Sequence, residues 1–143
     1  MEYFSGKTGN RLHVMRLDAG DYLLESIMTL IEHQNIRNAV VVSGIGTLDH
    51  CVLHMVMTTS YPAVEHFERW ENTPLELASI DGIIADGVPH LHMVISDHQK
   101  AYAGHVEPGC RTLYLCEIVI QEIEGCELIR RKDANGINKL QLK

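Results

Sequence analysis

Residues 89–97 read PHLHMVISD, and a glycine-histidine pair that ends at His105 follows shortly afterwards. Alternate residues of a β-strand point to the same face of a sheet, so a strand here would direct His90 and His92 to one side. If Asp97-His98 forms a two-residue turn, the returning strand places His105 directly opposite His90 on that side. The stretch therefore predicts a hairpin that gathers three imidazoles on one face.

Three convergent histidines are a recurring arrangement for binding a divalent ion. Neutral imidazole is the commonest protein ligand for zinc and similar ions, and three histidines with one open position recur in catalytic sites. The alternative is that His90 and His92 are ordinary exposed strand residues, because nine histidines in 143 residues bring some of them close together by chance. The spacing alone leaves both interpretations open.

The composition is that of an ordinary globular protein, with 45% hydrophobic and 22% charged residues. A chain of 143 residues is expected to form a single domain, here with a core over residues 11–131 and a polar, loose C-terminal tail after Asp133. The first seven residues show no signal pattern, and no apolar run is long enough to span a bilayer. We therefore expect a cytoplasmic protein with no membrane partner.

The formal net charge is -7, from 19 acidic and 12 basic residues. Tight non-specific binding to nucleic acid needs clustered lysine and arginine, so this charge disfavours it. The four cysteines show no CxxC spacing and are expected to be small buried residues or surface thiols rather than disulfides.

The pattern before residue 60 predicts several strands and one helix. Residues 11–17 alternate as a strand with Leu12, Val14 and Leu17 on its apolar side. The turn that follows ends in Asp21, which is a good helix N-cap. One helix face is predicted over residues 22–33, with Asn35 as its terminator, and two strands follow. The ranges of those two strands are 38–47 and 48–57.

The rest of the chain alternates between loops and strands. Residues 59–73 are predicted as a long loop, with a short helix over 64–70 as an alternative, and Asp86-Gly87 is a strong hairpin turn. Further strands are predicted over residues 75–80, 83–85, 112–123 and 126–131, in addition to the histidine strand. The sum is an α+β fold, with a largely antiparallel sheet of about seven or eight strands and one main helix.

Several motifs spread over residues 11–131 match those of one family in order and spacing. They are RL and DYLLES between residues 16 and 26, VVSGIGT at 41–47, LELASIDG at 75–82, PHLH at 89–92 and AGHV at 103–106. Together they resemble the PPC domain, the plant and prokaryote conserved domain, in its stand-alone prokaryotic type.

This resemblance implies a strongly bent antiparallel sheet, a homotrimer, and a metal site near a subunit boundary. The positions of His90, His92 and His105 match the histidines of prokaryotic members, and His54 lies where it could approach the same site. A divalent transition metal, with zinc the first choice, and a small-molecule ligand at that metal follow as expectations. Plant members lack these histidines and are tied to transcription. This chain has no Arg-Gly-Arg core of an AT-hook, which disfavours DNA as its partner.

Two carboxylates lie within apolar strands, where an unpaired charge is costly. Glu76 and Glu117 are interpreted either as a partner of a metal-bound histidine or a general base for bound water, or as residues paired with an arginine or with solvent. Three hypotheses for the function remain. They are a metal-binding trimer with enzymatic activity left open, a DNA-associated regulator, and a binding module held together by a structural ion.

Overall fold

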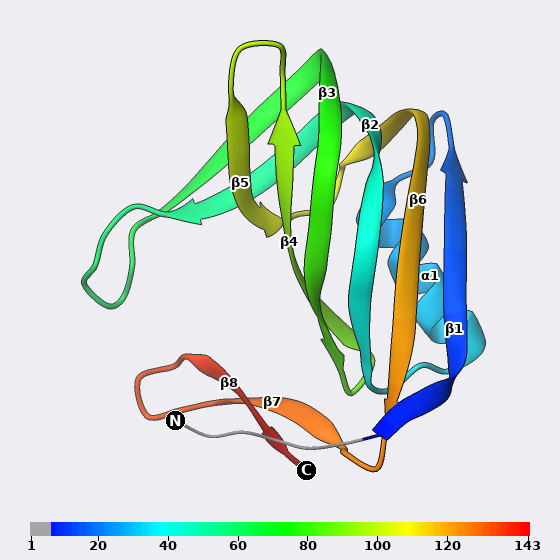
Figure 1. Cartoon of the computed structure of the whole chain (residues 1–143). Coiled ribbons are helices and arrows are strands. Elements are labelled where there is room, and N and C mark those ends of the chain that lie inside the picture. Colours follow the sequence, from blue (N-terminus) through cyan, green and yellow to red (C-terminus); the bar gives the residue numbers. More distant parts are fainter. Residues whose placement is uncertain (1–6) are drawn as a thin grey trace.

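The computed structural model describes residues 7–143. Residues 1–6, on which the expected lack of a signal pattern largely rests, lie outside this part. The described chain forms one helix and eight strands (Figure 1). Their bounds are β1 Lys7–Asp18, α1 Leu23–Gln34, β2 Ala39–Val56, β3 Glu65–Ala85, β4 Val88–Ser96, β5 Ala101–Val106, β6 Arg111–Glu124, β7 Leu128–Lys132 and β8 Asn138–Leu142.

The main sheet is antiparallel, with the strand order β1-β6-β2-β3-β4-β5, while β7 and β8 form a separate two-stranded sheet. This confirms the predicted α+β class. The prediction of a loose tail after Asp133 is wrong, because β8 pairs along β7. The Asp133 carboxylate accepts hydrogen bonds from the backbone N–H groups of Asn135 and Ile137, which stabilises the turn between the two strands.

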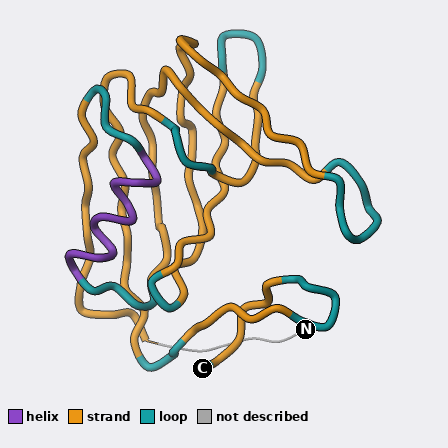
Figure 2. The backbone as a smooth tube through the Cα atoms, turned by 180° about the vertical axis from the view of Figure 1, so that it is seen from behind, coloured by secondary structure: helices purple, strands orange, loops and turns teal. Residues whose placement is uncertain are grey.

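The predicted helix is confirmed, and it covers one face of the sheet (Figure 2). Leu23, Ile27 and Ile31 are buried on its apolar face, and each buried side chain of this size stabilises the fold by about 1.5–3 kcal/mol. Asn35 ends the helix in a left-handed conformation, as expected of a C-cap.

The predicted N-cap is displaced by one residue, to Tyr22. Asp21 is not free for this role because its carboxylate accepts a hydrogen bond from the Asp18 N–H within the preceding turn, at 2.9 Å. No helix in the described part of the chain has the length and apolarity needed to cross a membrane.

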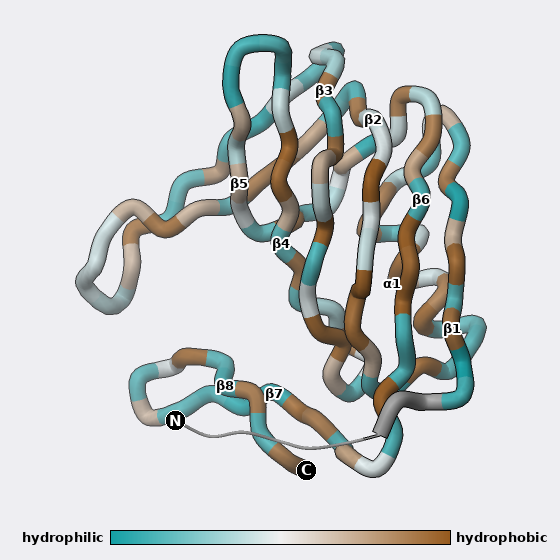
Figure 3. Tube along the Cα trace, in the orientation of Figure 1, coloured by the Kyte–Doolittle hydropathy of each residue, from teal (hydrophilic) through white to brown (hydrophobic). Residues whose placement is uncertain are grey.

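The apolar side predicted for β1 is correct only at Leu17. Leu12 and Val14 are 57% and 72% exposed, whereas Leu17 is buried and Met15 packs against the core. The register explains this, since β1 places Met15 opposite the buried Ile118 of β6. Figure 3 shows apolar stretches along the central strands β2 and β6.

β2 and β3 are longer than the sequence pattern predicts. The two predicted strands at 38–47 and 48–57 form one continuous β2, and β3 runs through Gly82 without a break. The predicted loop over 59–73 is confirmed only for residues 59–64, because β3 begins at Glu65, which pairs with Val56, and the alternative helix over 64–70 is wrong. Most side chains in this first part of β3 are polar or exposed, which explains why no apolar period marked it as a strand.

β4 follows β3 through the predicted Asp86-Gly87 turn. Both turn residues have positive φ, at 51° and 78°, as a two-residue turn between antiparallel strands requires. β5 then returns along β4 and also pairs with β2, through Leu53 opposite Val106 and His54 opposite His105. The four strands β2, β3, β4 and β5 therefore close on themselves.

Gly104 allows β5 to approach β2 this closely. A Cβ at this position would lie 2.9 Å from the His54 carbonyl oxygen and 3.1 Å from the Leu53 Cβ. The neighbouring backbone could not move away without opening the pairing of β2 with β5.

We predict that Gly104→Ala destabilises the protein by about 1–3 kcal/mol, because the added methyl group overpacks the contact between the two strands. Urea unfolding monitored by circular dichroism measures this change. Gly125→Ala is the control, since nothing lies within 4 Å of its Cβ and its φ of +70° adds only local backbone strain. Equal losses in both variants would show that the β2–β5 contact tolerates a methyl group.

Candidate metal centre

β4 directs His90 and His92 to one face, as the alternation predicts. Leu91 and Met93 alternate with them and are buried in the core, which fixes the direction of the two imidazoles. Their ring centroids lie 5.4 Å apart.

The register between β4 and β5 differs from the prediction. His105 lies opposite His92, not His90, because residues 97–100 form the loop instead of a two-residue turn at Asp97-His98. The Asp97 carboxylate accepts hydrogen bonds from the N–H groups of Gln99 and Lys100, at 2.7 and 2.9 Å, and so favours the longer loop. His105 nevertheless joins the cluster, with its ring centroid 5.1 Å from His90 and 5.5 Å from His92.

His54 joins the cluster from β2. The pairing of β2 with β5 places it opposite His105, with the ring centroids 5.5 Å apart. Its ring stacks on Phe67 of β3 at 5.0 Å. Its Nε2 atom is buried and has no hydrogen-bond partner. The Oε1 atom of Glu65 lies 3.4 Å from this nitrogen, within ion-pair distance. The structure thus brings together all four predicted histidines.

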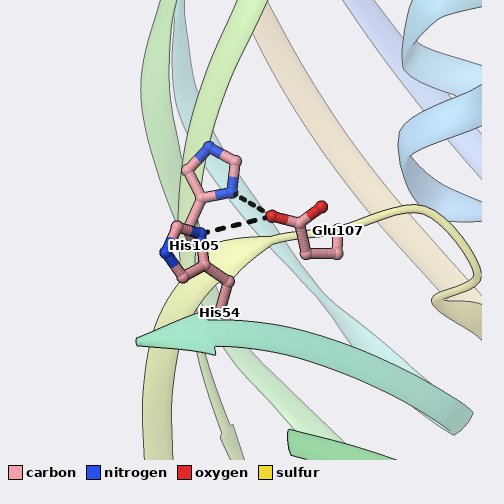
Figure 4. A group of neighbouring side chains, drawn as sticks. All are labelled: His54, His105 and Glu107. Atoms are coloured by element: carbon pink, nitrogen blue, oxygen red, sulfur yellow. Dashed lines mark hydrogen bonds and ion pairs between the residues drawn. The ribbon is translucent and has the colours of Figure 1, made fainter. Parts of the chain in front are cut away.

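Glu107 completes the cluster, and the sequence analysis did not identify it. Its Oε1 atom accepts a hydrogen bond from His105 Nδ1 at 3.1 Å and lies 3.4 Å from His54 Nδ1 (Figure 4). Because Glu107 is two residues beyond His105, the same-face rule that singled out His90 and His92 would have predicted it. It lies just after the last residue of β5.

The other polar residues that the sequence singled out lie outside this cluster. Glu76 and Glu117 are both exposed, in agreement with contact to solvent rather than with a place beside the imidazoles. Three of the remaining histidines pair with acidic residues elsewhere, and His33 is exposed in the last turn of α1. The pairs are His13–Glu122, His50–Asp49 and His66–Glu68, at 2.7, 2.8 and 2.9 Å.

The imidazoles surround a cavity of about 560 Å³. Apolar groups form most of the remaining wall, as is common for small-molecule sites. The lining residues are His54, Met55, Val56, His90, His92, Ala103, Gly104 and His105.

The spacing of the rings fits a shared ion. Imidazoles on one tetrahedral ion, with metal–nitrogen distances of about 2.1 Å, have ring centroids about 5 Å apart. The rings of His90, His92 and His105 have this spacing. The ligand atoms that already lie within 4.8 Å of one another are those of His54, His105 and Glu107. A group of imidazoles with one carboxylate is a donor set suited to zinc and similar transition metals.

The surroundings favour the neutral form of two of these imidazoles, which is the form that binds metal. The side of each ring that faces the cluster loses contact with water, and this lowers the pKa of His90 and of His92. The charge of Arg130 lowers the pKa of His90 further, and His105 lowers the pKa of both.

Comparison with known proteins identifies one domain family. The model of the Plants and Prokaryotes Conserved (PCC) domain matches residues 4–124. Among curated proteins, the chain is 26% identical over 136 residues to the bifunctional protein GlmU of Synechococcus sp. (strain JA-3-3Ab). That match covers 93% of this chain, which spans about a fifth, 21%, of the relative's length.

Two solved structures share the fold. The metal-containing protein AF0104 of Archaeoglobus fulgidus has a TM-score of 0.81 and 23% identity, with 99% of each chain covered. A plant- and prokaryote-conserved (PPC) protein of Pyrococcus horikoshii has a TM-score of 0.80 and 23% identity, with 99% of this chain and 97% of the other covered.

We predict that His92 of the metal-free protein titrates below the ordinary histidine value of about 6.5, and that His105→Ala raises its pKa. NMR titration of the imidazole Cε1 protons measures both values, and His66→Ala is the control because His66 lies outside the cluster. At a pH between the pKa of His92 in the folded protein and its pKa in the unfolded chain, the unfolded chain binds more protons than the folded protein does. The free energy of unfolding therefore falls as the pH drops from 7 to 5. An unchanged His92 pKa in His105→Ala would contradict this coupling.

Proposed function

This chain belongs to the Plants and Prokaryotes Conserved domain family, and we propose that it is a homotrimeric protein that binds a divalent transition metal through His90, His92 and His105. Zinc is the expected ion. His54 is the further ligand of the proposed site. The observation that carries the proposal is the convergence of four imidazoles from β2, β4 and β5 on one cavity. The description of AF0104 as metal-containing supports it.

Each residue of the cluster has a defined part in this proposal. His90, His92 and His105 hold the ion, and His54 supplies its buried Nε2 atom, which has no hydrogen bond. Glu107 fixes the Nδ1–H tautomer of His105 and so presents the Nε2 atom of that ring to the ion. A bound divalent ion would act as a Lewis acid toward an oxygen or nitrogen of a small-molecule ligand. Met55 and Val56 supply apolar groups to the wall of the cavity beside it.

The trimer is supported by an apolar surface on the sheet face opposite the helix. Val14, Val42 and Ile45 are each more than half exposed there, and isolated β-sheet faces of this kind are usually covered by another chain. Light scattering after gel filtration tests this part of the proposal, with an expected mass of three times the 16.1 kDa chain. A mass of one chain at micromolar concentration would contradict it.

DNA binding stays the alternative prediction. Five of the twelve basic side chains lie in ion pairs with acidic neighbours, and together with the net charge of -7 this disfavours phosphate contacts. The pairs are Arg11–Glu122, Arg16–Asp18, Arg37–Asp86, Arg111–Asp49 and Lys139–Asp133. Affinity for duplex DNA that falls steeply with added salt would favour the alternative.

We predict that the untagged protein, purified without chelator, retains about one transition-metal ion per chain, and that His92→Ala retains less than about a tenth of it. Elemental analysis by mass spectrometry measures the metal, and circular dichroism checks that the variant keeps its sheet. His66→Ala is the matched control, because it removes an exposed strand histidine outside the cluster.

Full metal content in His92→Ala would show that the ligand assignment is wrong. Dissociation of the trimer on removal of the metal would instead favour an ion with a structural role at the subunit boundary. A trimer that survives chelation and regains metal supports an ion that is available to a ligand.

A further inference from the structure

Two cysteines far apart in the sequence meet in the core next to the metal centre. Cys51 of β2 and Cys110, which directly precedes β6, are both fully buried, and their Sγ atoms lie 4.0 Å apart. They are separated by 59 positions in the chain. Two thiols at this distance need only a small movement to form a bond, since the sulfur–sulfur bond of a disulfide is about 2.05 Å long.

Cys110 ends the turn that carries Glu107. Its sulfur lies 3.3 Å from the Glu107 carbonyl oxygen and 3.6 Å from the Val52 carbonyl oxygen, within reach of S–H···O hydrogen bonds. The Val52 N–H donates to the same sulfur at 3.4 Å. The thiol of Cys110 is therefore one of the contacts that hold this turn against β2.

We propose that Cys51 and Cys110 are a peroxide-sensitive thiol pair that closes into an intrachain disulfide and thereby displaces Glu107 from the imidazole cluster. In the first step the Cys110 sulfur attacks hydrogen peroxide, forms Cys110–SOH and releases water. In the second step the Cys51 sulfur attacks Cys110–SOH, and the disulfide forms with release of a second water. Two thiols thus lose two protons and two electrons, and one peroxide becomes two waters.

The surroundings assign different parts to the two sulfurs. The Val52 N–H donates to the Cys110 sulfur at 3.4 Å, which favours Cys110 as the attacking thiolate, and the thiols of Cys110 and Cys51 share a hydrogen bond. The pKa of Cys51 is raised by the same hydrogen bond and by burial. Cys51 lies within a paired strand, whereas Cys110 follows Gly109, whose Cβ would meet only the Val52 Cγ2 atom at 3.8 Å. Cys110 lies in the connection between β5 and β6, outside the paired strands.

The other two cysteines have different surroundings. Cys116 is buried, with its sulfur 3.6 Å from the Thr112 hydroxyl and 3.7 Å from the Thr47 carbonyl oxygen. Cys126 lies in the smaller apolar cluster with Ala85 and Leu128. We expect both to stay reduced when the first pair is oxidised.

Disulfide formation changes the turn and, through it, the metal centre. The Cys110 sulfur loses its proton and moves toward Cys51, so its contact with the Glu107 carbonyl oxygen is lost. Glu107 is three residues before Cys110 and contacts both His54 and His105 through its carboxylate. Loss of a carboxylate partner of a metal-binding histidine commonly weakens metal affinity about tenfold or more. This last step rests on the proposed function, whereas the disulfide itself does not.

The experiment treats the full-length protein with a few equivalents of hydrogen peroxide and then counts free thiols and measures the intact mass. We expect the wild type to lose two of its four thiols and about 2 Da, and peptide mapping to link Cys51 to Cys110. Cys110→Ser and Cys51→Ala should form no disulfide, whereas Cys116→Ser should behave as the wild type does. Peptide mapping of the wild type needs no variant and gives the result even if one variant fails to fold.

Retention of all four thiols, or a disulfide that contains Cys116 or Cys126, would overturn the proposal.

The second measurement is the zinc affinity of the oxidised and the reduced protein, by competition with a chromogenic chelator. We expect the oxidised wild type to bind zinc about tenfold more weakly than the reduced protein. Equal zinc affinity in the two forms would refute the link to Glu107. Disulfide formation in a protein that binds no metal in either form would refute the proposed function and leave the thiol pair established.

Discussion

The pairing of β5 with β2 is the interaction on which the candidate site depends. Without it, the sheet would be an open row of strands with His54 near its middle and His105 on its outer edge. The pairing is short, since it joins only Leu53 with Val106 and His54 with His105. It is nevertheless stable, because Leu53 and Val106 are buried and Gly104 has no side chain to keep the strands apart. One contact therefore closes the sheet and completes the imidazole cluster.

Local patterns in the sequence predict those parts of the fold whose two faces meet different surroundings. Alternation identifies β4 and β6, and the spacing of Leu23, Ile27 and Ile31 identifies the helix, because in each case one face meets the core and the other meets solvent. The same rule places His90 and His92 side by side, and applied two residues beyond His105 it would also have found Glu107. The four ligands predicted for the site thus came from local spacing and from the family resemblance, and their convergence is a property of the closed sheet.

The parts that the sequence did not predict are those where long-range contacts or polar side chains decide. The first part of β3 has no apolar period because much of it faces solvent, so only its pairing with β2 identifies it as a strand. The loop after β4 is four residues long because the side chain of Asp97 binds two backbone N–H groups. Likewise, the apolar side of β1 cannot be read from Leu12 and Val14, because the sheet has apolar residues on both faces. No local pattern distinguishes the face that packs on the helix from the face left exposed.

The way the cluster is held also bears on what a metal ion there can do. Leu91 and Met93 anchor the strand of His90 and His92, and buried Val106 anchors that of His105. These apolar anchors stabilise both strands by burial alone, so the fold does not need an ion to hold the imidazoles in place. His90 and His92 themselves are exposed and contribute little to the core. The imidazoles are therefore in place before an ion binds, and an ion that binds only the folded chain would add stability in proportion to its affinity.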